Sequence, residues 1–335
     1  MKALVTGGAG YIGSTIVCAL EDAGHDVVIL DDLRVGSPAF MEGRAAYVAQ
    51  IGDRPAVREI LRAHPDIAAV VHCAASTSAP ESVREPLAYY TNNLSQAFVL
   101  IDEIVGSGCD RFLFSSSAAV YDGDLTGAVH EGHPLRPSNP YGESKLMLES
   151  VLGDVVAAGG LRSVSLRYFN PIGADLGLRT GPPPRSTSVM SHLVRSAMTG
   201  DPFTIHGDDW PTHDGTASRD YVHVVDVARA HVAVLERFDA VTADEPAQVF
   251  NVGTGRGTTV RELVDAVQVA VGRPIATRLG PRRPGDPVGG WAEVGKIAHS
   301  VGWRAELSVG DGVRDAISWA VAEPTRRKAD RPPSR

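Results

Sequence analysis

The chain has 335 residues, 43% of them hydrophobic and 21% charged, which is the composition of a folded globular protein with room for two hydrophobic cores. Its formal net charge of −8 argues against a general nucleic-acid binder, whose phosphate contacts would require a basic face. No apolar run reaches the ~18 residues that span a bilayer, and the chain starts directly in a strand-like run without a signal peptide. We therefore expect a cytoplasmic protein with neither a membrane nor a nucleic-acid partner.

Short apolar runs alternate with helical patterns through the first half of the chain. Continuous apolar strands that alternate with helices are typical of a parallel sheet covered on both faces. The sequence therefore predicts an α/β fold with a doubly wound, Rossmann-type sheet. The expected strands are Ala3–Thr6, Asp26–Leu30, Ala68–His72, Arg111–Ser115 and Val164–Tyr168, and the expected helices begin near Tyr11, Pro55, Tyr89 and Tyr141.

A glycine-rich turn, Gly7-Gly-Ala-Gly10-Tyr-Ile-Gly13, joins the first expected strand to the first expected helix. Glycines at these positions allow a tight turn and a close approach of a pyrophosphate to backbone N–H groups, although such glycines can also serve only as a turn. Asp31 ends the second strand close to the ~20-residue spacing at which a carboxylate receives the adenosine ribose. Asp31 and Asp32 would repel a 2′-phosphate, so the pattern favours NAD over NADP despite Arg34 nearby. The alternative is that the two aspartates merely cap a loop.

Tyr141 and Lys145 lie four residues apart at the start of an expected helix, and therefore on one face of it. A tyrosine with its ordinary pKa of about 10 is a poor base at neutral pH, but a nearby ammonium favours the phenolate. Ser117 follows the fourth strand at the sheet edge where open parallel sheets bind ligands. Chance spacing and a plain polar loop are the alternatives for these residues. Together the three side chains predict a hydride-transfer site at a nicotinamide.

The second half of the chain changes character after Asn170, with a Gly-, Pro- and Arg-rich stretch and shorter, mixed elements. We expect residues 1–172 to form the NAD-binding domain, completed by segments near 224–252. Residues 173–323 are expected to form a smaller mixed α/β domain that binds the substrate. Residues 324–335 are expected to be a disordered basic tail.

Cysteine and histidine usage does not suggest a metal site. Cys18, Cys73 and Cys109 are odd in number and lack C-x-x-C spacing, so we expect buried thiols in a reducing compartment. The histidines beside the motifs are expected to serve in packing.

Ordered motifs along nearly the whole chain carry a resemblance to the extended short-chain dehydrogenase/reductases, and among them to the UDP-glucose (UDP-galactose) 4-epimerases. The agreement extends to about Val321. The matching segments are TGGAGYIGS (6–14), DDL (31–33), HCAA (72–75), ESV (81–83), NN (92–93), SSSAAVY (115–121), NPYGESK (139–145), LRYFNPIGA (166–174), GDDWPTHDGT (207–216), RDYVHVVDVA (219–228), FNVGTG (250–255) and RRPGD (282–286).

The resemblance implies an NAD-dependent isomerase of carbohydrate and galactose metabolism that acts through a 4-keto sugar. Tyr141 would take the proton of the sugar 4-hydroxyl, and Ser117 would hydrogen-bond the same oxygen. Lys145 would hold the nicotinamide ribose and keep Tyr141 ionised. The resemblance also implies a homodimer, formed through the helices that start near Tyr89 and Tyr141.

Further site residues follow from the matched motifs. The cofactor contacts implied by resemblance or motif are Gly7, Gly10, Tyr11, Ile12, Gly13, Asp31, Leu33, Asp53, Ala74, Asn92, Ser115, Tyr141, Lys145 and Tyr168. The UDP-sugar contacts are Ser117, Asn170, Arg219, Val260, Arg283, Asp286 and Gly290. Arg219 and Arg283 would bind the diphosphate, since an arginine fork matches phosphate oxygens, and Asp286 would bind the ribose. Surface ion pairs are the alternative for the two arginines.

The chain departs from the family pattern at several positions. Thr77 replaces a lysine that reaches toward the cofactor, and Asp122 replaces a glycine. The uracil-side asparagine is lost near Ser188–Met190. Gly290 falls where some members carry a tyrosine, which would leave room for a larger sugar substituent, so we expect UDP-GlcNAc and UDP-GalNAc to be substrates as well.

Three other functions compete with this interpretation. A sugar-nucleotide 4,6-dehydratase needs an acid and a base next to the strand-end hydroxyl, where this chain has Ala118 and Ala119. A UDP-uronate or UDP-pentose 4-epimerase would differ in only a few contacts around C6 of the sugar. A non-catalytic NAD-binding protein could dispense with Tyr141 and Lys145, which this chain retains.

Overall fold

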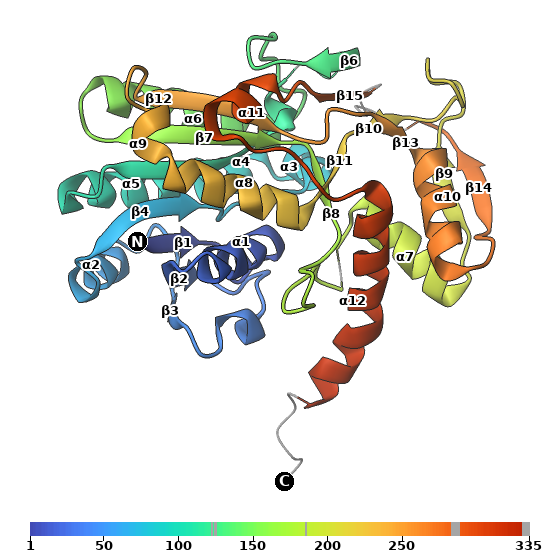
Figure 1. Ribbon diagram of the computed structural model, residues 1–335, viewed down its shortest axis with the longest axis horizontal. Coiled ribbons are helices and arrows are strands. Elements are labelled where there is room, and N and C mark those ends of the chain that lie inside the picture. Colours follow the sequence, from blue (N-terminus) through green and yellow to red (C-terminus); the bar gives the residue numbers. More distant parts are fainter. Residues whose placement is uncertain (122, 124–125, 185, 283–288, 330–335) are drawn as a thin grey trace.

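The computed structural model describes residues 1–121, 123, 126–184, 186–282 and 289–329. Its centre is a seven-stranded parallel sheet with the strand order β12-β7-β5-β4-β1-β2-β3 (Figure 1). The strands are β1 (Lys2–Thr6), β2 (Asp26–Asp31), β3 (Ala45–Val48), β4 (Ile67–His72), β5 (Arg111–Ser117), β7 (Arg162–Tyr168) and β12 (Ala247–Val252). The order reverses between β1 and β4, which is the point where open α/β sheets bind ligands.

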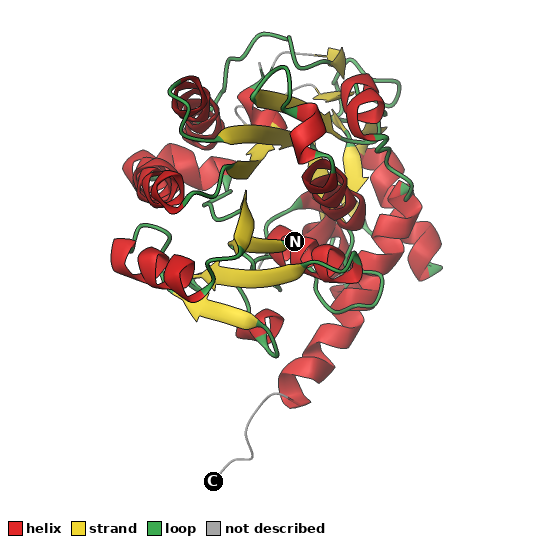
Figure 2. Ribbon diagram, turned by 60° about the vertical axis from the view of Figure 1, so that its left-hand side comes forward, coloured by secondary structure: helices red, strands yellow, loops and turns green. Residues whose placement is uncertain are grey.

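Helices cover both faces of this sheet, as Figure 2 shows from a second side. Successive residues of β1 point to opposite faces, so Ala3 and Val5 belong to one core and Leu4 to the other. The first core is closed by α1 (Tyr11–Asp22), α8 (Val224–Glu236) and α11 (Gly295–Val301). The second is closed by α2 (Arg54–Ala63), α5 (Gln96–Ser107) and α6 (Pro140–Ala157). The predicted doubly wound, Rossmann-type sheet is confirmed.

The structure differs from the predicted elements at two places. The edge strand β3 was not predicted, because its sequence Ala-Ala-Tyr-Val is short and only partly buried. The helix expected near Tyr89 is three segments, α4 (Pro86–Tyr90), the π-helix η2 (Thr91–Ser95) and α5. A π-helical turn of this kind often marks a functional site.

A smaller part with its own core lies beyond the carboxyl end of the sheet (Figure 1). Its helices are α7 (Val189–Thr199), α10 (Val260–Val271) and α12 (Val309–Ala329). The described residues outside the main sheet form four two-stranded pairs: β8 (Asn170–Ile172) with β11 (Tyr221–His223), β10 (Ser218–Arg219) with β13 (Thr258–Thr259), β9 (Phe203–His206) with β14 (Thr277–Gly280), and β6 (Thr126–Val129) with β15 (Gly289–Ala292). The expected smaller C-terminal domain is confirmed, and its boundaries stay predictions.

Four short helices complete the fold: η1 (Pro38–Met41), α3 (Ala79–Arg84), η3 (Ala118–Val120) and α9 (Phe238–Val241). The last helix, α12, continues to Ala329 and so includes residues 324–329, which composition predicted as disordered. Residues 330–335 of that expected tail lie outside the described residues. In the described part of the chain no helix is long and apolar enough to cross a bilayer. Cys18, Cys73 and Cys109 are free thiols.

Candidate active site

The glycine turn between β1 and α1 leaves no room for side chains. Gly7 has a positive φ of 71°, and a Cβ there would lie 2.7 Å from the backbone nitrogen of Ala74. A Cβ on Gly13 would lie 2.1 Å from the carbonyl oxygen of Gly7, so only glycine permits this packing of helix on strand. Gly10 caps α1 with extended backbone. The resulting bare backbone at a helix N-terminus fits a pyrophosphate.

Asp31 is the last residue of β2 and lies beside the glycine turn. Its carboxylate accepts hydrogen bonds from the backbone N–H groups of Ala9 at 3.0 Å and Leu33 at 2.8 Å, so it is fixed beside the glycine turn. Burial raises the pKa of this carboxyl, an effect that the two backbone hydrogen bonds oppose. Leu33 is held at a positive φ of 58°. A fixed, buried carboxylate at this point fits the ribose of a dinucleotide.

Three other residues expected at the cofactor, Tyr11, Ile12 and Asn92, are held by contacts with neighbouring segments. The Tyr11 hydroxyl donates to the Gly173 carbonyl at 2.7 Å, and Ile12 packs on the first core. Asn92, in the π-helix, donates to the Ser76 hydroxyl at 3.2 Å and accepts from Arg34, which itself pairs with Asp32.

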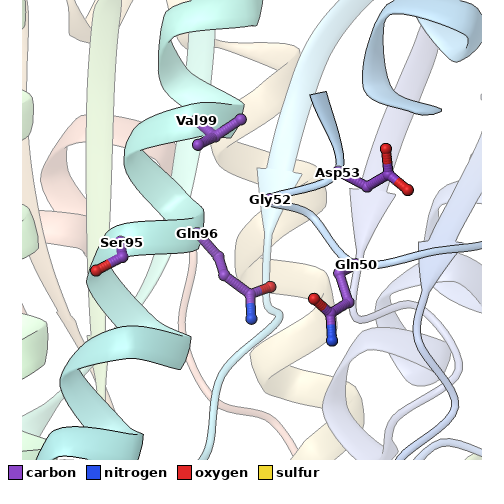
Figure 3. A pocket seen from close by; sticks show the side chains of 6 residues that line it. All are labelled: Gln50, Gly52, Asp53, Ser95, Gln96 and Val99. Atoms are coloured by element: carbon purple, nitrogen blue, oxygen red, sulfur yellow. The ribbon is translucent and has the colours of Figure 1, made fainter. Parts of the chain in front are cut away.

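Asp53 caps α2 and accepts from the backbone N–H of Ala56 at 3.2 Å. It also lines a hollow of about 440 Å³ between the loop after β3 and α5 (Figure 3). The rest of that lining is Gln50, Gly52, Ser95, Gln96 and Val99. Its polar amides and carboxylate suit a flat base with several hydrogen-bonding positions.

Lys145 is buried, with 4% of its surface exposed. Its ammonium donates to the backbone carbonyl of Ser115 at 2.8 Å and lies 4.8 Å from the ring centroid of Phe114 and 5.9 Å from that of Tyr141. Burial lowers the pKa of Lys145 to about 8, and the nearby Cys73 and Glu149 act in the opposite direction. The helix start therefore holds a lysine that can change charge near neutral pH.

Tyr141 and Ser117 meet at the carboxyl end of β5. Burial raises the pKa of the Tyr141 phenol, and a hydrogen bond with the Ser117 side chain lowers it. The Ser117 hydroxyl also accepts from the backbone N–H of Ala119 at 3.1 Å. The sequence-predicted trio is thus brought together in space, while charge control of Tyr141 by Lys145 stays a prediction.

Tyr168 ends β7, and Ser115 lies in β5 two residues before Ser117. A hydrogen bond with Ser115 lowers the pKa of Tyr168, but burial dominates and raises this pKa well above its ordinary value. The Ser115 hydroxyl also contacts the Cys73 sulfur at 3.1 Å. Both residues act here as packing and hydrogen-bonding groups.

The two-stranded pairs contain or adjoin four residues expected at the UDP-sugar: Asn170, Arg219, Val260 and Gly290. Asn170 starts β8, and its backbone N–H donates to the Asp220 carbonyl at 2.9 Å. Arg219 in β10 pairs with Thr258 in β13, and Val260 starts α10 just after it. Gly290 lies in β15, whose first residue packs against Ser218. Arg283 and Asp286 lie outside the described residues, so their expected roles stay predictions.

Sequence reasoning missed two buried groups at this site. Asp220 accepts hydrogen bonds from the backbone N–H groups of Thr254, Gly255 and Ala292, and it thereby joins the loop after β12 to the end of β15. The other is the buried ion pair of Arg167 with Glu149. A buried arginine within β7, whose sequence is Arg-Ser-Val-Ser-Leu-Arg-Tyr, gave no clear signal for the second.

The residues that depart from the family pattern lie in η3, in the loop after β4 and at the start of α7. Ala118 and Ala119 lie in η3 immediately after Ser117, so no acid or base follows the strand-end hydroxyl. Thr77 is exposed. Ser188 caps α7 and accepts from the backbone N–H of Ser191, in the segment expected at the uracil. Asp122 lies outside the described residues. No group of three metal-ligating side chains is found in the described ranges.

Comparison with known proteins agrees with this geometry. Residues 3–253 match the model of the NAD dependent epimerase/dehydratase family. The UDP-glucose 4-epimerase of Azospirillum brasilense is 42% identical over 325 residues, which are 95% of this chain and 91% of that protein. A crystal structure of UDP-glucose-4-epimerase from Stenotrophomonas maltophila, with bound NAD and formylated UDP-arabinopyranose, superposes with a TM-score of 0.92 at 36% identity and covers 97% of this chain and 99% of that one.

The UDP-Glc/GlcNAc 4-epimerase of Campylobacter jejuni superposes with a TM-score of 0.81 at 34% identity and covers 95% of this chain and 98% of that one. The resemblance drawn from the motifs is therefore confirmed over nearly the whole length. The chain belongs to the NAD dependent epimerase/dehydratase family and, within it, to the UDP-glucose 4-epimerases.

Proposed function

We propose that this protein interconverts UDP-glucose and UDP-galactose by epimerisation at C4. The single observation that carries the proposal is the meeting of Tyr141 and Ser117 at the end of β5, on the same sheet as the glycine turn after β1. The protein is an NAD-dependent isomerase. When bound, NAD supplies a reversible hydride acceptor at C4 of the sugar, so no net oxidation results.

Residues of the chain transfer the proton and hold the cofactor. Tyr141 takes the proton of the 4-hydroxyl and returns it, and Ser117 holds the same oxygen by a hydrogen bond. Lys145 binds the nicotinamide ribose and supplies positive charge beside the phenol. The cradle of Gly7, Gly10, Tyr11, Ile12 and Gly13 holds the pyrophosphate. Around it, the adenosine and nicotinamide halves contact Asp31, Leu33, Asp53, Ala74, Asn92, Ser115 and Tyr168.

The nucleotide half of the substrate is bound on the side of the smaller domain. Asn170, Arg219 and Val260 contact the UDP portion, with Arg219 directed to the diphosphate. Arg283 is expected to share the diphosphate and Asp286 to bind the uridine ribose. A locally cationic site of this kind suits a dianionic substrate on a protein of net negative charge.

An incubation of the purified protein with UDP-galactose, UDP-GalNAc and UDP-galacturonate, followed by chromatographic separation, tests the proposal. The expected product of UDP-galactose is UDP-glucose, with no lasting change in absorbance from reduced cofactor. Turnover of UDP-galacturonate in place of UDP-galactose would favour the uronate epimerase. Absence of any turnover would favour a non-catalytic NAD-binding protein.

Gly290 is proposed to set the size of the sugar that the site accepts. Because it has no side chain, we expect UDP-GalNAc to be converted as well as UDP-galactose. Gly290→Tyr should reduce turnover of UDP-GalNAc by more than about 10-fold and leave UDP-galactose turnover within about threefold. UDP-galactose serves as the internal control for folding. Equal loss of both activities, or exclusion of UDP-GalNAc by the unchanged protein, would contradict this role.

A homodimer is proposed from the exposed apolar side chains of neighbouring helices. Leu87 on α4 and Phe98 on α5 are 79% and 44% exposed, and Val83 on α3 and Met147 on α6 are also exposed. Sedimentation equilibrium should give twice the 35.4 kDa chain mass. Glu at both Leu87 and Phe98 should yield monomers, whereas Glu at the exposed Val269 of α10 should not. A monomeric unchanged protein would refute the proposal.

A cytoplasmic location is also proposed, since the three cysteines are free thiols. Cell fractionation followed by immunoblotting would show the protein with cytosolic markers, and recovery in a membrane fraction would contradict it.

A further inference from the structure

Arg167 of β7 and Glu149 of α6 form an ion pair, with only 4% and 7% of their side chains exposed. Arg167 donates to both Glu149 oxygens, at 3.0 Å from Nε and 2.5 Å from Nη2. The Ser116 hydroxyl donates to the same carboxylate. Burying two charges is costly, and such a pair is retained at no gain in stability over an apolar pair of the same volume. This pair therefore calls for a role other than stability.

The position of the pair in the fold indicates what it holds. Ser116 and Arg167 are direct neighbours in the β5–β7 register, and Glu149 reaches both from α6. Ser117 follows Ser116 at the end of β5, and Tyr168 follows Arg167 at the end of β7. The pair thus fastens α6 to the two strands whose ends form the site.

A second set of hydrogen bonds extends this anchor to the substrate side. Arg167 Nη1 donates to the Tyr121 hydroxyl at 3.0 Å and to the Glu131 carbonyl at 3.2 Å. The Tyr121 hydroxyl in turn donates to the Asn251 side chain at 2.7 Å, in β12. The segment that carries Ala118 and Ala119 is therefore fixed at its far end by the same arginine.

Glu149 also lies one helical turn after Lys145, on the same face of α6 as Tyr141. Two other titratable groups face Lys145 from β4 and the residue after it. Burial lowers the pKa of His72 to about 3, and burial raises that of Cys73 to about 11. Burial also raises the pKa of the Tyr141 phenol. His72, Cys73 and the cofactor-free Tyr141 are thus uncharged near neutral pH, whereas the Glu149 carboxylate is held in the ion pair with Arg167.

We propose that Glu149 is a positioning residue of the catalytic centre: clamped by Arg167 and Ser116, it sets α6 on the strand ends and keeps Lys145 in its ammonium form. The inference rests on the proposed function only for its effect on turnover. The charge of Lys145 can be measured without any turnover.

The chain has only four lysines, so the titration of Lys145 can be followed directly by NMR of lysine labelled with ¹³C at Cε. The full-length protein is used as purified, and Lys145→Met assigns the signal. In Glu149→Gln, the midpoint of the Lys145 titration should fall by at least about one pH unit relative to the unchanged protein, because the opposite charge is lost and Arg167 is left unpaired. Lys2 and Lys296 should titrate as before. The kcat for UDP-galactose should fall by about 10-fold or more with KM within about threefold.

Glu103→Gln is the matched control. Glu103 is as buried as Glu149, with 8% of its side chain exposed, and it pairs with Arg54 and Arg58 between α5 and α2, away from the site. This variant should lose stability without moving the Lys145 midpoint or kcat.

A double variant, Glu149→Met with Arg167→Met, covers the case in which Glu149→Gln does not fold, because an apolar pair replaces both charges. Its Lys145 midpoint should fall less than in Glu149→Gln, because the positive charge of Arg167 is removed as well, but its kcat should fall by about 10-fold or more. A Lys145 midpoint in Glu149→Gln within about 0.3 units of the unchanged protein, or an unchanged kcat in the double variant, would overturn the proposal. Failure of the unchanged protein to turn over UDP-galactose would instead refute the proposed function and leave the NMR result standing.

Discussion

Tyr141→Phe is expected to reduce turnover of UDP-galactose by about 10²–10⁴-fold, the range that a positioned acid–base group contributes. The ring would keep its half-buried place at the start of α6, but the oxygen that shares a hydrogen bond with Ser117 would be gone. Burial alone raises the pKa of this phenol, so ionisation depends on positive charge brought next to it. Initial rates with saturating UDP-galactose would measure the effect.

Two measurements distinguish loss of chemistry from loss of structure in that variant. The amount of NAD released on denaturation should equal that of the unchanged protein, since the phenyl ring still fills the space. Tyr47→Phe removes a hydroxyl that hydrogen-bonds to His64, between β3 and α2, and should keep full activity. Full activity in Tyr141→Phe would refute the mechanism.

The parts of the site that the sequence predicted depend on short-range patterns. Gly7, Gly10 and Gly13 lie within one turn between strand and helix, and the space at Gly7 and Gly13 admits no Cβ. Tyr141 and Lys145 lie four residues apart on one helix, so their shared face follows from helical geometry. In such cases the local backbone dictates the arrangement, and the spacing of residues is enough to predict it.

The parts that were missed depend on contacts between distant segments. Nothing near Arg167 in the sequence indicates that its partners are Glu149, Tyr121 and the Glu131 carbonyl. The edge strand β3 is only four residues long and partly buried, because it lies at the end of the strand order and pairs with β2 alone among the described strands. The irregular path from α4 through η2 to α5 is likewise set by packing around Asn93, whose side chain donates to Ser144 in α6. Tertiary contacts decide these features, and a single sequence does not show which contacts form.

Lys145→Met is expected to lower kcat by about 10²–10³-fold and, at the same time, to leave the thermal midpoint at pH 7 unchanged or higher. Burial holds the pKa of Lys145 at about 8 in the folded protein, below its ordinary value of about 10.4 in the unfolded chain. The folded state therefore binds this proton more weakly than the unfolded state does. Below pH ~8 the buried ammonium destabilises the fold, and this penalty disappears as the pH rises from about 8 to about 10.4.

Turnover and stability should therefore respond to pH in opposite directions. As the pH rises through the Lys145 pKa, the ammonium that supports Tyr141 is lost and kcat should fall, while the free energy of unfolding should gain the contribution that the charge had removed. The Met variant should show neither change. Lys296→Met, which removes an exposed ammonium bonded to the Val249 carbonyl, should keep both responses. Retention of more than a tenth of the turnover in Lys145→Met would mean that Tyr141 is ionised without this lysine. The positive charge that favours the Tyr141 phenolate would then have to come from the cofactor alone.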